Sequence, residues 1–115
     1  MKTKPQKEMT LETITDYLNN NSLLKARSIL ADYKDASIKI TGVISKIAKR
    51  EGLLRFVVET TAKERKMTIF ANFDSEKAKA KVKEMKIKKG KTVNLAGNFQ
   101  TAGTEAICLN NCKLN

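Results

Sequence analysis

Cations and a few aromatic rings are the side chains best suited to ligand chemistry in this sequence. The chain of 115 residues carries 23 Lys and Arg against 12 Asp and Glu, a formal net charge of +11, and it has four Phe and two Tyr. A positive field of this size attracts polyanions, and the release of condensed counterions from nucleic acid supplies affinity that does not depend on sequence. The composition therefore favours a nucleic-acid ligand.

Residues that commonly perform catalysis or hold metals are scarce. The sequence has no His, so it lacks an imidazole base, and its two cysteines, Cys108 and Cys112, cannot make a four-ligand metal site. On one strand they would lie ~13 Å apart, too far for a disulfide. We therefore expect a protein that is not an enzyme, with no cofactor, metal or small-molecule substrate, and with reduced cysteines.

Targeting signals are also missing from the pattern. No run approaches the ~18 apolar residues that a membrane-spanning helix needs, and no apolar segment follows the basic first residues as in a secretory signal. These observations predict a cytoplasmic protein without membrane contact. Residues 1–9 are rich in charge and contain the single proline, which predicts a mobile basic tail.

Residues 10–35 form a predicted N-terminal helical segment. Thr10 is suited to begin a first short helix, and Ser22 to cap a second. The apolar stripe of the first helix consists of Leu11, Ile14 and Leu18. Because a lone helix would leave this stripe exposed, we expect the segment to pack on the following domain or on a second copy, which makes a homo-oligomer one possible assembly.

Residues 36–115 form the predicted main domain, in which apolar residues alternate with a period of two. The alternation predicts five strands, near 37–45, 54–59, 66–73, 93–99 and 105–114. Between the third and the fourth, a helix capped by Asp74 or Ser75 is expected to run to about Lys86. Gly42 marks a bulge or bend in the first strand. This order predicts a mainly β fold with α elements, a five-stranded OB-fold barrel preceded by two short helices.

Three segments support this fold by resemblance. ASIKITGVI at 36–44, IKKGKTVNLAG at 87–97 and LNNCKL at 109–114 resemble the first, fourth and closing strands of the tRNA_anti-like group of OB-fold proteins. The resemblance implies nucleic-acid binding and kinship with small OB proteins, some of which occur on plasmids. Because the matched positions are structural, it carries over no individual functional residue.

The site is predicted from strand geometry instead. OB folds bind oligonucleotides along their second and third strands and the loops beside them. If Met67, Ile69 and Phe73 are buried, alternation turns Phe70 outward, where an aromatic ring can stack on a base. The predicted nucleic-acid-binding residues are Lys49, Arg50, Arg55, Lys66, Thr68, Phe70 and Phe99.

Alternatives stay open at several of these positions. The N-terminal helices could cover Phe70, Phe99 could continue the core alternation of its strand, and the lysines of residues 77–91 suit a solvated helix face. For function, the sequence favours binding of single-stranded nucleic acid, DNA before RNA. The alternative is an OB-fold module for protein interaction or assembly, with an acidic partner and no direct contact to nucleic acid.

Overall fold

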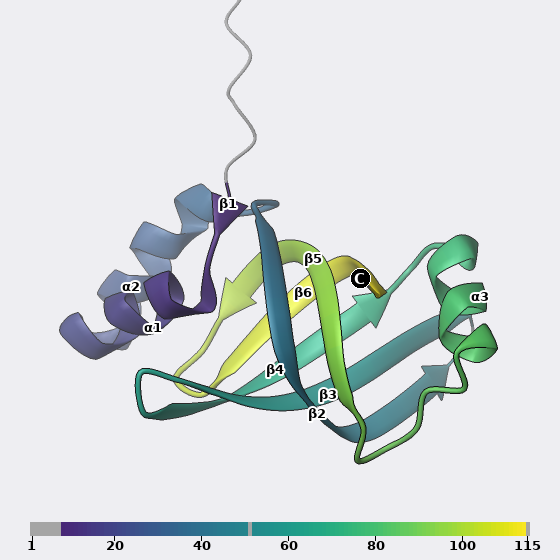
Figure 1. The fold of residues 1–115 in the computed structure, drawn as a ribbon. Helices are drawn as coiled ribbons and strands as arrows, with labels where there is room; N and C mark the ends of the chain where they lie inside the picture. Colours follow the sequence, from purple (N-terminus) through teal and green to yellow (C-terminus); the bar gives the residue numbers. More distant parts are fainter. Residues whose placement is uncertain (1–7, 51, 115) are drawn as a thin grey trace, which may run out of the picture.

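A closed barrel of five strands dominates the computed structural model, which describes residues 8–50 and 52–114. The strands neighbour one another in the order β2-β3-β4-β6-β5, and β5 pairs back to β2 (Figure 1). The strands are β2 (Ser37–Arg50), β3 (Leu53–Ala62), β4 (Arg65–Phe73), β5 (Thr92–Ala102) and β6 (Ala106–Leu114). With α3 (Glu76–Glu84) between β4 and β5, this is an OB-fold barrel, as predicted.

The long strand β2 serves both halves of the barrel. Its first half pairs with β5 and its second half with β3, and the change occurs at Val43. At Gly42 the strand passes so close to β3 that a Cβ atom would lie 2.6 Å from the carbonyl oxygen of Glu59. Only glycine fits this bend.

The bulge in β2 lies after Gly42, because the register with β3 shifts between Ile44 and Lys46. The extra residue reverses the alternation, so that Lys46 faces outward and Ile47 inward. The simple alternation read from the sequence did not anticipate this reversal.

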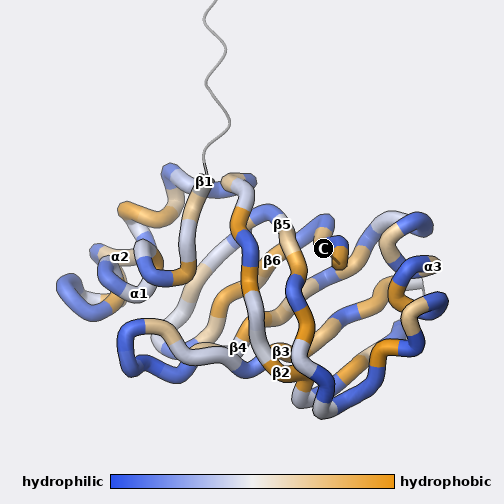
Figure 2. Tube along the Cα trace, in the orientation of Figure 1, coloured by the Kyte–Doolittle hydropathy of each residue, from blue (hydrophilic) through white to orange (hydrophobic). Residues whose placement is uncertain are grey.

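The barrel interior contains the apolar residues that alternation predicted. Hydropathy alternates along the strands, as Figure 2 shows, and the inward set of β4, Met67, Ile69 and Phe73, is at most 1% exposed. Both cysteines are free thiols; Cys112 is buried in the core, and Cys108 is half-buried. The inferred registration of β4, on which the outward placement of Phe70 depends, is confirmed.

Two short helices precede the barrel and share its core. They are α1 (Leu11–Asn20) and α2 (Leu23–Leu30), followed by the 3-10 turn η1 (Ala31–Tyr33). The hydroxyls of Thr10 and Ser22 accept hydrogen bonds from backbone N–H groups of the first turns. The predicted start of the first helix at Thr10 and the predicted N-cap Ser22 are therefore confirmed. The stripe of α1 is buried against the barrel, and Ile14 is fully enclosed.

The predicted mobile tail is wrong at its last two residues. Glu8 and Met9 form the strand β1 (Glu8–Met9), which pairs in parallel with the start of β2, and Met9 is buried. The contact of Met9 with the core outweighs the polar composition around it. The remainder of the predicted tail, residues 1–7, lies outside the described residues.

The helices occupy opposite ends of the barrel (Figure 1). At one end, Asp16 of α1 forms an ion pair of 3.2 Å with Lys63, and Asn19 accepts a 2.7 Å hydrogen bond from Arg65, both in the β3–β4 hairpin. At the other end, α3 stops at Glu84, earlier than predicted, and Met85 directly after it is 46% exposed. Across the described ranges, no helix is long and apolar enough to cross a membrane.

Candidate nucleic-acid interface

The outer face of β3 and β4 is built from cross-strand pairs. Arg55 lies opposite Asn72, Val57 opposite Phe70, and Glu59 opposite Thr68. Alternation turns these side chains away from the core, because Phe56 and Val58 between them are fully buried. We call this outer surface the β3–β4 face; it consists of Arg55, Val57, Glu59, Lys66, Thr68 and Phe70.

The neighbouring strands widen the β3–β4 face on both sides. Lys46 of β2 pairs with Val57, and Cys108 of β6 pairs with Phe70. One row across the sheet therefore contains a cation, an aliphatic side chain, an aromatic ring and a thiol. Such a row offers both a charge for a phosphate and a ring for a base.

Arg55 is positioned by a chain of hydrogen bonds. Its Nε donates to Oδ1 of Asn72 at 2.7 Å, and Nδ2 of Asn72 donates to Oδ1 of Asn110 at 3.0 Å. Asn72 is only 7% exposed, so its amide is a fixed support. The guanidinium carbon of Arg55 lies 5.6 Å from the ring centroid of Phe70, within cation–π distance.

Phe70 borders an open groove of about 270 Å³. The groove also touches Cys108, the β5–β6 loop and Arg27, which reaches it from α2. Phe70 itself is half-buried and keeps part of its surface exposed. The N-terminal helices attach at the end of the barrel and leave the groove beside Phe70 open. The N-terminal helices therefore do not cover Phe70 completely, although Arg27 of α2 borders the same groove.

The structure brings together most of the predicted site residues. Arg55, Lys66, Thr68 and Phe70 share the β3–β4 face, and Arg50 lies on the same side of the sheet by its pairing with Leu53.

Two predicted site residues lie elsewhere. Lys49 pairs with the inward residue Leu54 and therefore points toward the barrel end at α3. Phe99 is 1% exposed and belongs to the core, so its assignment as a binding residue is wrong. It continues the buried alternation of Val93 and Leu95, which left no face for a ligand.

The charge of the β3–β4 face is mixed. The carboxylate of Glu59 lies on it and accepts hydrogen bonds from the hydroxyls of Thr68, at 2.9 Å, and Ser45, at 3.1 Å. The densest run of positive charge lies instead on α3 and the segment that follows it, where eight of the 23 Lys and Arg residues fall within residues 77–91. The face therefore combines one aromatic ring with a few cations and a carboxylate, and it is not uniformly basic.

Two cations that lie near Phe70 in the structure were not predicted from the sequence. Lys46 would have been found had the bulge been placed after Ile44, and the apolar Ile47 that follows it was the available signal. Arg27 lies far from Phe70 in the sequence, and only the packing of α2 beside the β5–β6 loop brings it near.

Comparison with protein families identifies the chain. The model of the tRNA_anti-like family matches residues 6–113, nearly the whole sequence. The chain belongs to the tRNA_anti-like family. The match extends over the N-terminal helices, which the sequence motifs did not reach. Compared with functionally curated proteins, this tRNA_anti-like chain gives no match.

Solved structures share the fold of this tRNA_anti-like protein. A candidate nucleic acid-binding lipoprotein from Klebsiella pneumoniae subsp. pneumoniae MGH 78578 is 22% identical with a TM-score of 0.58, over 94% of this chain and 92% of its own. A chain of the Stn1–Ten1 complex of S. pombe is 18% identical with a TM-score of 0.50, over 69% of this chain and 57% of its own. At these identities the likeness concerns the fold.

Proposed function

We propose that the protein binds single-stranded nucleic acid on the β3–β4 face, without catalysis and with little dependence on sequence. The observation that carries the proposal is the pair of Phe70 and Arg55, which lies on the face that OB folds use for oligonucleotides. The family and the name of the Klebsiella pneumoniae relative agree with nucleic-acid binding. We further propose a cytoplasmic location.

The ring of Phe70 would stack on a base, and Arg55 would meet the adjoining phosphate or extend the stack with its guanidinium plane. Stacking requires only the flat face of a base, which all four bases have, so it tolerates any sequence. A duplex keeps its bases stacked on one another and cannot offer one to the ring. Single strands are therefore the preferred ligand.

DNA is the proposed form of the strand. Discrimination in favour of RNA requires polar groups that pair with the 2′-hydroxyl. On the β3–β4 face, the hydroxyl of Thr68 is engaged by Glu59, and the amide of Asn72 by Arg55 and Asn110. The face thus has few polar groups left for a ribose hydroxyl.

Substitution of Phe70 tests the proposal. Phe70→Ala should weaken binding of a fluorescent single-stranded DNA by ~1–3 kcal/mol, the value of one stacked base, with an unchanged melting temperature. Phe70→Leu is the matched control, because it keeps an apolar side chain but removes the ring, and it should lose most of the same affinity. If Phe70→Leu binds like the parent protein, or a matched duplex binds as tightly as the single strand, the stacking proposal is wrong.

A further inference from the structure

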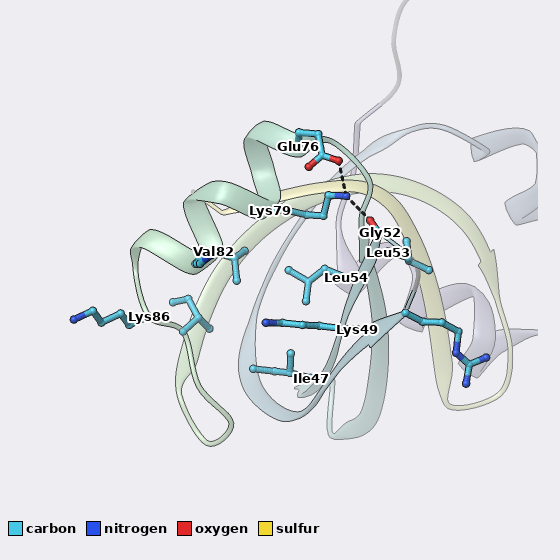
Figure 3. Close-up of a pocket in the computed structure, with 12 residues that line it drawn as sticks. Ile47, Lys49, Gly52, Leu53, Leu54, Glu76, Lys79, Val82 and Lys86 are labelled. Carbon is cyan, nitrogen blue, oxygen red and sulfur yellow. Dashed lines mark hydrogen bonds and ion pairs between the residues drawn. The ribbon is translucent and has the colours of Figure 1, made fainter.

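A second concave surface lies at the end of the barrel that α3 closes. It is a cleft of about 650 Å³ between α3 and the β2–β3 hairpin, shown in Figure 3. Its lining is divided between the hairpin, at residues 47, 49, 50 and 52–54, and α3 with the turn after it, between Glu76 and Ile87. It adjoins the β3–β4 face at the hairpin lip, where Arg50 and Leu53 turn outward, whereas Ile47, Lys49 and Leu54 lie on the inner side. We call it the α3 cleft.

The floor of the α3 cleft is aliphatic. It consists of Ile47, Leu53, Leu54, Val82 and Ile87, and none of the described residues that line the cleft is aromatic. Leu53 is 38% exposed, and Ile47 and Ile87 are half-buried, so part of this floor faces solvent. Exposed aliphatic surface in a concave site favours a ligand with bulky apolar groups.

The rim of the α3 cleft is positive. Among the described residues that line it, the cations are Lys49, Arg50, Lys79, Lys83 and Lys86, and the acidic side chain is Glu76. Lys79 bonds to Glu76 at 3.0 Å and to the carbonyl oxygen of Gly52, which ties the helix to the hairpin turn and neutralises the carboxylate.

The other cations of the rim are available to a ligand. In the part of the chain that the structure describes, Lys49 and Lys83 have no ion pair. The side chain of Lys49 extends from β2 toward α3 (Figure 3). An anionic group at the rim would therefore meet cations that no carboxylate of the described residues already neutralises.

We infer that the α3 cleft binds an acidic peptide segment of a partner protein, with bulky aliphatic side chains on the floor and carboxylates at the rim. A nucleic acid would satisfy the rim but would find no ring on which to stack. A second copy of this chain is disfavoured, because its net charge of +11 repels an equally basic cleft. The inference is independent of binding at Phe70.

The test uses fluorescein-labelled peptides and the full-length protein. The probe is an eight-residue peptide that alternates acidic residues with leucine, and the matched control peptide has serine at the leucine positions. Lys83→Glu lies in the cleft, and Lys77→Glu makes the same change of net charge on an exposed part of α3 outside it. Leu53→Ser removes floor surface, and Leu24→Ser is its control on the exposed side of α2.

The leucine peptide should bind at low salt and the serine peptide at least tenfold more weakly. Lys83→Glu should weaken binding of the leucine peptide about tenfold, because it replaces an attraction at the rim by a repulsion, and Lys77→Glu should weaken it much less. Leu53→Ser should also weaken it, whereas Leu24→Ser and Phe70→Ala should leave it unchanged.

Three results would overturn the inference. The first is that the leucine peptide does not bind at all. The second is that the leucine and serine peptides bind equally, or that Lys77→Glu weakens binding as much as Lys83→Glu, since attraction would then depend on net charge alone. The third is that Lys83→Glu weakens single-stranded DNA more than Lys77→Glu does, which would assign the α3 cleft to nucleic acid.

Discussion

The salt dependence of single-strand binding can be predicted from the cations around Phe70. Phosphates of a strand on the β3–β4 face would come within reach of five basic side chains. These are Arg27, Lys46, Arg50, Arg55 and Lys66. The eight lysines of residues 77–91 lie on and after α3 and should contribute only a diffuse attraction.

The magnitude follows from counterion release. Each neutralised phosphate of a single strand contributes about −0.7 to the slope of log affinity against log salt, so five contacts give a slope of about −3.5. Between 50 and 200 mM salt, such a slope weakens affinity about 100-fold. A strand that engaged the lysines of residues 77–91 as well would give a much steeper slope.

Fluorescence anisotropy with a labelled oligothymidine at four or more salt concentrations measures this slope. Arg55→Gln, which keeps a polar partner for Asn72, should reduce the slope by about 0.7, and Lys77→Gln should leave it unchanged. Phe70→Ala should lower affinity equally at every salt concentration, because stacking releases no counterion.

A slope that is unchanged by Arg55→Gln but reduced by Lys77→Gln would refute the reasoning. The strand would then follow α3, and the β3–β4 face would have another role.

Three further predictions concern the fold that holds the site. Gly42→Ala should cost about 1–3 kcal/mol of unfolding free energy, since its Cβ would lie 2.6 Å from β3, whereas Gly103→Ala, with its nearest atom at 3.9 Å, should be close to neutral in thermal melting. Ile14→Ala should cost ~2–5 kcal/mol in urea unfolding, because the side chain is fully buried between α1 and the barrel; a loss below 1 kcal/mol would contradict that docking. Burial raises the pKa of the Cys112 thiol to about 12, so its contribution to folding stability is full below the ordinary thiol pKa and is lost as the pH rises toward 12. Urea unfolding at pH 8 and pH 11 should therefore show that the parent protein loses about 3 kcal/mol more unfolding free energy than Cys112→Ala does. Equal losses in the two proteins would contradict this prediction.

The barrel could be predicted from sequence because its signals are local. The alternation of apolar residues predicted which side chains of β4 face the core. A cap residue such as Ser22 predicted where its helix begins. The outward position of Phe70 followed from the same alternation, since a slip by one residue would have buried Lys66.

The rest of the site depends on features that are not local. The bulge after Ile44 reversed the alternation of β2 and brought Lys46 to the β3–β4 face, while Lys49 turned inward. Arg27 reaches the groove through packing between segments distant in sequence. The α3 cleft exists because α3 packs beside the β2–β3 hairpin. The spacing of the lysines along α3 does not predict which part of the barrel the helix contacts.

The most direct test of the central claim is a residue-by-residue map of the protein surface that contacts the bound strand. Two-dimensional NMR spectra of the ¹⁵N-labelled protein, recorded during titration with oligothymidine, report which backbone amides change. Binding on the β3–β4 face predicts the largest shifts at Lys46, Val57, Phe70 and Cys108, which form one row across the sheet. Largest shifts within residues 77–91, with this row unchanged, would contradict the account.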